Sequence, residues 1–126
     1  MDVKQILLTY LRGSRDGLLW KAEGLSEREL RLPRTVTGTN LLGLVKHCAY
    51  VEHRYVITCF GRTSPLTIPD LDYDADPNAD FYATAEESAA EILGLYREVG
   101  VVVDRAVEEM TLDTPGHAAW WGERGD

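Results

Sequence analysis

The sequence has few of the features that mark a membrane, secreted or nucleic-acid-binding protein. Only two of its 126 residues are cysteine, and it contains no Asn-x-Ser/Thr glycosylation acceptor. No segment approaches the roughly 18 consecutive apolar residues of a membrane-spanning helix. Lys and Arg number 13 against 21 Asp and Glu, which gives a net charge of -8. Because phosphate backbones are bound by clustered basic residues, this charge argues against a nucleic-acid partner and is interpreted as a means of solubility.

The two cysteines, Cys48 and Cys59, fall within one predicted helix and are not expected to pair. At about 1.5 Å rise per residue they would lie roughly 16 Å apart along the axis, whereas a disulfide needs Cα atoms within about 7 Å. The N-terminus also lacks a basic region followed by a long apolar run, so we expect no signal peptide. Free thiols in such a chain favour a cytoplasmic location.

Apolar residues recur at three- and four-residue steps in three segments, which predicts an all-α protein. Helices are expected over residues 3–23, 41–60 and about 84–110, within a single domain spanning 1–126. We expect these three long helices to form an antiparallel bundle. Three apolar stripes rarely close a core, so a fourth helix, from this chain or from a partner, is expected to complete it.

Local signals place the ends of these helices. Ser26 and Glu29 form a capping box that predicts a short helical turn, and Thr39 or Asn40 is expected to cap the second long helix. A second capping box, Thr84-Ala85-Glu86-Glu87, is expected to open the third. The segment 62–82 between them holds three of the five prolines and predicts a long loop.

Two polar residues of the second predicted helix are candidates for chemistry. His47 falls at the edge of the apolar face, a position that suits a metal ligand and equally a surface histidine packed on one side. Glu52 falls near the centre of that face, where a carboxylate is costly unless it is paired. It is therefore either a site residue or the partner of a basic residue on the first helix in a structural salt bridge, with Arg12, Arg15 or Lys21. His53 lies on a different face from His47.

The acidic loop resembles a calcium-binding loop only in part. Asp70-x-Asp72-x-Asp74 imitates the start of an EF-hand loop, which needs Gly at its sixth position and Glu at its twelfth. The sequence has Ala75 and Phe81 there. We therefore interpret this segment as a solvated acidic loop. Motifs for a serine nucleophile, a P-loop, a dinucleotide or a Cys-x-x-Cys metal site are missing as well.

Three stretches together resemble the DinB/YfiT-like superfamily of metal-dependent helical-bundle proteins, most closely an actinobacterial-type branch. They are Leu18–Ser26 (LLWKAEGLS), Gly38–Glu52 (GTNLLGLVKHCAYVE) and Pro115–His117 (PGH). The resemblance runs to about residue 120 and is most specific around His47. It implies a four-helix bundle, often a homodimer. It also implies a divalent metal, zinc or nickel, held by three histidines, and the use of a low-molecular-weight thiol such as mycothiol or bacillithiol.

The resemblance carries over only one metal ligand, His47. The other two would form a His-x-x-x-His pair on the fourth helix, and the sequence ends where that helix should begin. Two explanations stay open: the sequence belongs to a longer protein, or the helix and the metal have been lost. If the metal site exists, Glu52 is the candidate acceptor that orients His47.

Two functions follow from these observations. The first is a divalent-metal-dependent thiol S-transferase or isomerase of the mycothiol or bacillithiol type, acting on a small-molecule substrate. The alternative is a non-catalytic dimeric helical bundle or small-ligand-binding module without a complete metal site. Neither function involves nucleic acid or a membrane.

Overall fold

The computed structural model describes residues 2–125, and every regular element in that range is a helix. The elements are α1 (Val3–Ala22), α2 (Glu27–Arg31), α3 (Leu41–His53) and α4 (Ala89–Glu109). A π-helical turn, Arg54–Thr58, continues α3, and a short kinked helix, Ala119–Gly125, closes the C-terminal segment. The all-α prediction is confirmed. Within the described range no helix combines the length and apolarity needed to cross a membrane.

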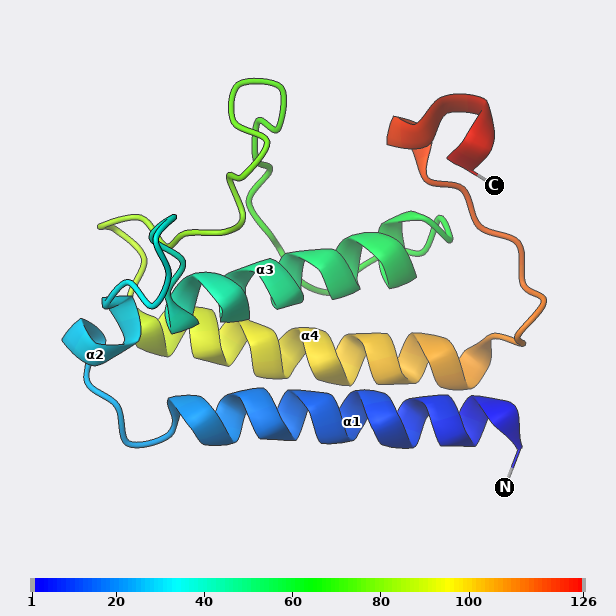
Figure 1. Cartoon of the computed structure of the whole chain (residues 1–126). Coiled ribbons are helices and arrows are strands. Elements are labelled where there is room, and N and C mark those ends of the chain that lie inside the picture. Colours follow the sequence, from blue (N-terminus) through cyan, green and yellow to red (C-terminus); the bar gives the residue numbers. More distant parts are fainter. Residues whose placement is uncertain (1, 126) are drawn as a thin grey trace.

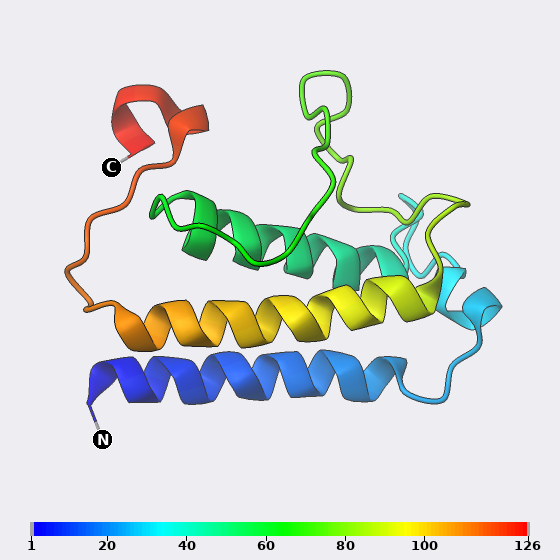
Figure 2. The same ribbon diagram turned by 180° about the vertical axis from the view of Figure 1, so that it is seen from behind.

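The three long helices pack side by side, with α4 between α1 and α3 (Figures 1 and 2). The predicted antiparallel packing holds for α1, which runs opposite to both neighbours. In contrast, α3 and α4 run in the same direction, since the long segment after α3 carries the chain back along the bundle before α4 begins. The bundle therefore has one long crossover connection, the segment between α3 and α4, and this segment lies over α3.

The core lies mainly between α3 and α4, which make more contacts than any other pair. Val45 and Ala49 of α3 and Val99 and Val103 of α4 have no solvent-exposed surface. In contrast, α1 leaves large apolar side chains in solvent: Val3, Ile6, Leu7, Tyr10 and Trp20. One apolar surface of the bundle is thus uncovered by residues 2–125, in line with the expectation that three stripes do not close a core.

The helix caps agree with the sequence prediction at two positions and differ at a third. Ser26 and Glu29 form the reciprocal capping box, and the Asn40 side chain accepts from the backbone N–H of Gly43. The predicted start of the last long helix near Thr84 is wrong. Ser88 is its cap, and α4 begins at Ala89.

Side chains from other elements explain the late start of α4. Arg31 donates to the backbone carbonyls of Thr84 and Glu87, so these carbonyls are engaged by a side chain. The Glu87 carboxylate is held by buried Lys46 of α3. Residues 84–87 therefore form a turn anchored on α2 and α3 rather than the first turn of a helix.

Candidate functional site

The loop between α3 and α4 folds onto α3 and brings Asp80 to His47. The His47 Nδ1 atom lies 2.9 Å from Asp80 Oδ1. The Asp80 side chain is 3% exposed, whereas that of His47 is 28% exposed. An ionised carboxylate only accepts hydrogen bonds, so Nδ1 carries the hydrogen in this pair and Nε2 is left for other partners.

Tyr73 occupies the second oxygen of Asp80. Its hydroxyl donates to Oδ2 at 2.9 Å, which gives the carboxylate one partner on each oxygen. Burial raises the pKa of Tyr73 to about 12, and the hydrogen bond to Asp80 and the charge of Asp80 add to the rise. The phenol therefore stays protonated near neutral pH and remains a donor. The result is a chain of three side chains, Tyr73, Asp80 and His47.

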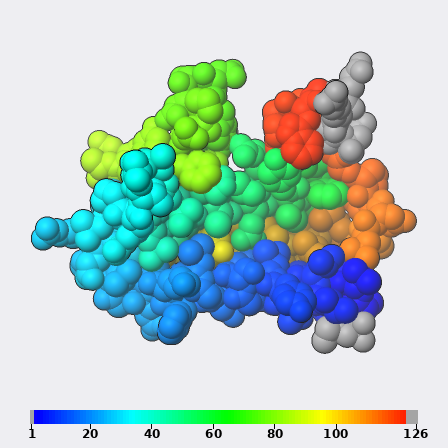
Figure 3. Space-filling view, in the orientation of Figure 1, coloured from blue at the N-terminus to red at the C-terminus, as the bar shows by residue number. Residues whose placement is uncertain are grey.

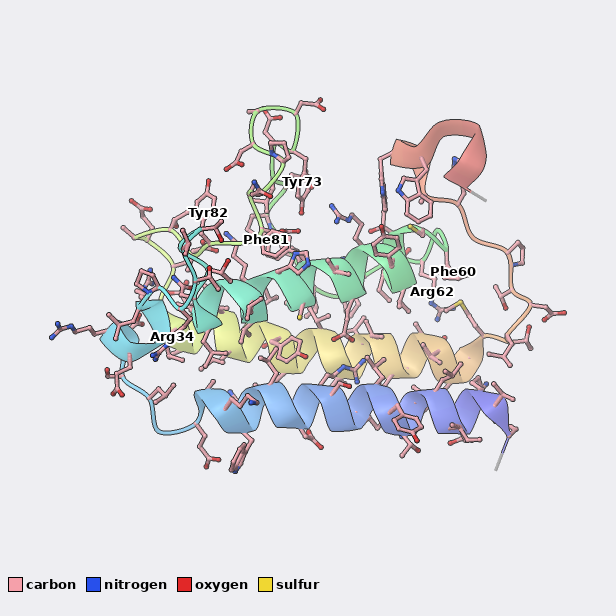
Figure 4. All side chains as sticks on the ribbon, viewed as in Figure 1. Arg34, Phe60, Arg62, Tyr73, Phe81 and Tyr82 are labelled. Carbon is pink, nitrogen blue, oxygen red and sulfur yellow. The ribbon has the colours of Figure 1, made fainter. Side chains whose placement is uncertain are left out.

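Phe81 covers one face of the His47 ring. The two ring centroids are 3.7 Å apart and the ring planes differ by 16°, so the rings are stacked. Figure 4 shows Phe81 and Tyr73 reaching α3 from the loop above it. The imidazole is thus fixed by a hydrogen bond at its edge and by an aromatic ring on its face, which limits its rotation.

Gly43 allows the backbone of the loop to come close to α3. It lies one helical turn before His47 on the same face of α3. A Cβ atom at this position would clash with the backbone carbonyl of Phe81. The glycine therefore lets the loop backbone touch the helix, and the two residues at the contact, Asp80 and Phe81, are the ones that hold His47.

Lys46 anchors the next part of the loop. Its side chain is 2% exposed, and Nζ donates to the Tyr82 carbonyl at 3.0 Å and to Glu87 Oε1 at 2.9 Å. A buried ammonium group needs such partners, because burial of a lone charge is costly. The consecutive residues Lys46 and His47 thus each hold a different stretch of the loop.

Glu52 lies apart from this arrangement and takes the salt-bridge alternative. Its Oε1 accepts from Arg15 Nε at 2.9 Å and from Nη2 at 2.6 Å, and Arg15 Nη1 reaches Asp104 at 2.6 Å. This network joins α1, α3 and α4. The arginine crosses α4 at Gly100, where a Cβ would lie 3.3 Å from its Cδ. The carboxylate that is hydrogen-bonded to His47 is therefore that of Asp80, and not that of Glu52, which was the candidate for this role.

The other histidines are placed elsewhere. His53 Nε2 lies 2.7 Å from the Ser64 hydroxyl, and burial lowers the pKa of His53. The backbone N–H of His117 donates to the Cys59 carbonyl, which joins the C-terminal segment to the end of α3. Cys48 and Cys59 are free thiols, as predicted, and burial raises the pKa of each.

The interpretation of the acidic loop as fully solvated is wrong for one residue. Asp70, Asp72 and Asp74 are exposed, but Asp80 is 2% exposed and belongs to the site. Sequence reasoning also did not identify Tyr73, Phe81 or Gly43 as site residues. A glycine four positions before His47 was the available signal, since it permits a close backbone approach on the same helix face.

The donors present do not fit the three-histidine metal site that the resemblance implies. Among residues 2–125, no three or more His, Cys, Asp or Glu side chains are grouped so that they could hold a metal ion. His47 offers one ring nitrogen, because the other is engaged by Asp80. A Zn²⁺ ion held by protein in a catalytic site normally has three protein ligands.

The arrangement of His47 and Asp80 can accept and release a proton. A histidine whose Nδ1–H is held by a buried carboxylate presents Nε2 as a base, in a fixed orientation. This pairing recurs where enzymes activate a hydroxyl or a thiol.

A family model described as Mycothiol-S-transferase matches residues 6–126, nearly the whole chain. No curated protein and no solved structure matches it.

Proposed function

Because the chain belongs to the mycothiol-S-transferase family, a DinB/YfiT-like helical family, we propose that it transfers the thiol of mycothiol to an electrophilic small molecule. The observation that carries the proposal at the level of residues is the hydrogen bond between His47 and buried Asp80. His47 lies in the segment around which the sequence resemblance to the family is most specific. Bacillithiol, the other thiol considered from the sequence, has no support from the family match.

In the proposed reaction His47 acts as the general base. Its Nε2 takes the proton of the mycothiol thiol, and Asp80 stabilises the imidazolium that forms. The thiolate sulfur then forms a bond to the electrophilic carbon. In a displacement a leaving group departs with the bonding electron pair, and in an addition the proton returns from His47 to the adduct. If addition is followed by elimination of the same thiol, the outcome is isomerisation.

The residues around the pair support this role. Phe81 keeps water from one face of the imidazole, and Tyr73 holds Asp80 as a hydrogen-bond acceptor. Since a thiolate is the nucleophilic form, a base fixed beside the thiol raises its reactive fraction at neutral pH. The proposed proton transfer is assigned to His47 and Asp80, and no step is assigned to a metal ion, since residues 2–125 contain no group of three donors that could hold one.

The test is thiol transfer from mycothiol to monobromobimane by the purified chain, followed by fluorescence. We expect His47→Ala to lower kcat/KM by about 100-fold or more, the range of general-base catalysis. The control is Asp74→Asn, in the exposed part of the loop, which should change the rate by less than about 3-fold. A folded wild-type chain with no rate above the uncatalysed reaction would contradict the proposal.

That negative result would leave the alternative of a non-catalytic helical bundle or small-ligand-binding module. The uncovered apolar side chains of α1 favour a further helix or a second copy on that face. The homodimer implied by the family resemblance therefore stays a prediction, which sedimentation equilibrium tests directly. The cytoplasmic location also stays a prediction, supported by the two free thiols.

A further inference from the structure

A cleft of ≈ 220 Å³ lies beside the His47 site, over the end of α3. Its lining includes Tyr50, His53 and Arg54 at the end of the helix, Asp70 and Tyr73 of the loop, and Trp120 of the C-terminal segment. Figure 3 shows this face of the molecule hollowed between the projecting loop, in green, and the C-terminal segment, in red.

Arg54 is the unusual group in this cleft. Its Nε is buried and has no hydrogen-bond partner among residues 2–125. The guanidinium carbon lies 4.7 Å from the ring centroid of Tyr73 and 5.0 Å from that of Trp120. These two aromatic rings therefore stabilise the cation, but they provide no hydrogen-bond acceptor for Nε. A buried donor without an acceptor costs free energy, and an anion in the cleft would satisfy it.

The position of Arg54 relates the cleft to the proposed chemistry. Seven residues separate it from His47, so it lies two turns along α3 on the same face, roughly 10 Å along the axis. Tyr73 connects the two places, since its ring faces Arg54 and its hydroxyl bonds Asp80. The π-helical turn begins at Arg54, and such turns are frequent at functional sites.

We propose that this cleft binds the carboxylate of an organic acid with a flat apolar body, and that such acids are the electrophilic substrates of the protein. Arginine presents a planar fork that matches a carboxylate, and the rings of Tyr73 and Trp120 suit a flat apolar body. A phosphate dianion is disfavoured, because Asp70 lines the cleft and Asp80 lies next to it through Tyr73. The substrate assignment rests on the proposed transferase function, whereas carboxylate binding itself does not.

The test uses benzoate as the probe, with benzamide as its neutral counterpart and inorganic phosphate as the other anion. Isothermal titration without mycothiol should show benzoate binding with a Kd on the order of 1 mM or tighter, and no measurable binding of the other two. Arg54→Gln should weaken benzoate binding at least 10-fold. Arg54→Lys should also weaken it several-fold, because an ammonium group cannot replace the fork. Arg28→Gln on α2, which removes the same charge from an exposed site at the far end, should leave it unchanged.

Four results would overturn the proposal: no benzoate binding by the wild type, equal binding of benzoate and benzamide, tighter binding of phosphate, or benzoate binding unchanged in folded Arg54→Gln and Arg54→Lys. Circular dichroism of each variant establishes that it is folded. Transfer to the neutral monobromobimane is measured in parallel, so the two proposals fail separately. Thiol transfer without benzoate binding would contradict only the proposed carboxylate site. Benzoate binding without thiol transfer would contradict the proposed transferase function and the substrate assignment that rests on it.

Discussion

His47 on α3 and Asp80 in the following loop form a hydrogen bond of 2.9 Å although they are 33 residues apart in the sequence. The contact depends on a third residue, Gly43, whose missing side chain lets the Phe81 backbone reach the helix. The base of the proposed reaction and the residues that orient it thus come from two segments. The predictions below separate their contributions.

Asp80→Asn should lower kcat/KM for thiol transfer by about 10- to 100-fold, because an amide cannot stabilise the imidazolium as a carboxylate does. Asp74→Asn, in the exposed part of the same loop, is the matched control. A lower rate that is fully explained by a smaller folded fraction, measured by circular dichroism, would mean that Asp80 acts only on folding.

Gly43→Ala should lower the free energy of unfolding by about 1–3 kcal/mol, the usual cost of overpacking, although alanine is the better helix former. It should also reduce transfer, because the loop that carries Asp80 is displaced. In Gly94→Ala on α4, the new Cβ would have no atom within 4 Å apart from the neighbouring backbone of its own helix, so the same change should stabilise the chain by about 0.5–1 kcal/mol. Urea unfolding of both variants measures the difference. Equal stabilisation by both would contradict the close approach at Gly43.

Glu52→Gln should act on stability and not on chemistry. It removes one of the two carboxylates that hold the Arg15 guanidinium, whose side chain is 8% exposed, so we expect a loss of about 1–3 kcal/mol. The pH–rate profile at a temperature where the variant is folded should match that of the wild type. A shifted profile would return Glu52 to the role of orienting His47.

Acid should weaken the fold through Asp104. Burial alone would raise its pKa, but hydrogen bonds from Arg12 and Arg15 outweigh burial and hold the pKa of Asp104 below its usual value. A carboxyl with a lower pKa in the folded state contributes stability above its unfolded pKa, about 4, and loses it as pH falls through the folded pKa.

The free energy of unfolding measured in urea should therefore decrease below about pH 4. In Asp104→Asn this decrease should be shallower, because one titrating group is absent. The exposed Asp74→Asn should keep the wild-type slope. A slope in Asp104→Asn as steep as that of the wild type would show that the Arg12–Arg15–Asp104 network does not set the acid response.

Metal content tests whether this chain binds the divalent metal that the family resemblance implies. With one free imidazole nitrogen at His47, we expect the 126-residue chain to retain less than about 0.1 equivalent of zinc or nickel after dialysis, measured by plasma mass spectrometry. The His47→Ala variant should give the same value. Nearly one equivalent in the wild type, lost in the variant, would show a real metal site at His47 and contradict this prediction.

Local signals in the sequence predicted the helices well. The apolar periodicity and the caps at Ser26 and Asn40 depend on neighbours within a few residues, so they can be found without a fold. The start of α4 was misplaced because the capping residues at Thr84 and Glu87 are engaged by Arg31 and Lys46, which come from distant segments. The contacts with these distant side chains thus outweighed the local capping signal at residues 84–87.

The sequence by itself determined the all-α class and the family, and it made His47 the candidate site residue. Those properties follow from periodicity and from residue types at fixed spacing along one helix. Only the tertiary structure decided which carboxylate serves His47. Glu52 is near in sequence but turns toward Arg15, whereas Asp80 is distant and arrives on a loop that touches α3 at Gly43. The path of a long loop is set by where a few side chains, here Lys46 and His47, hold it, and helix periodicity carries no information about that path.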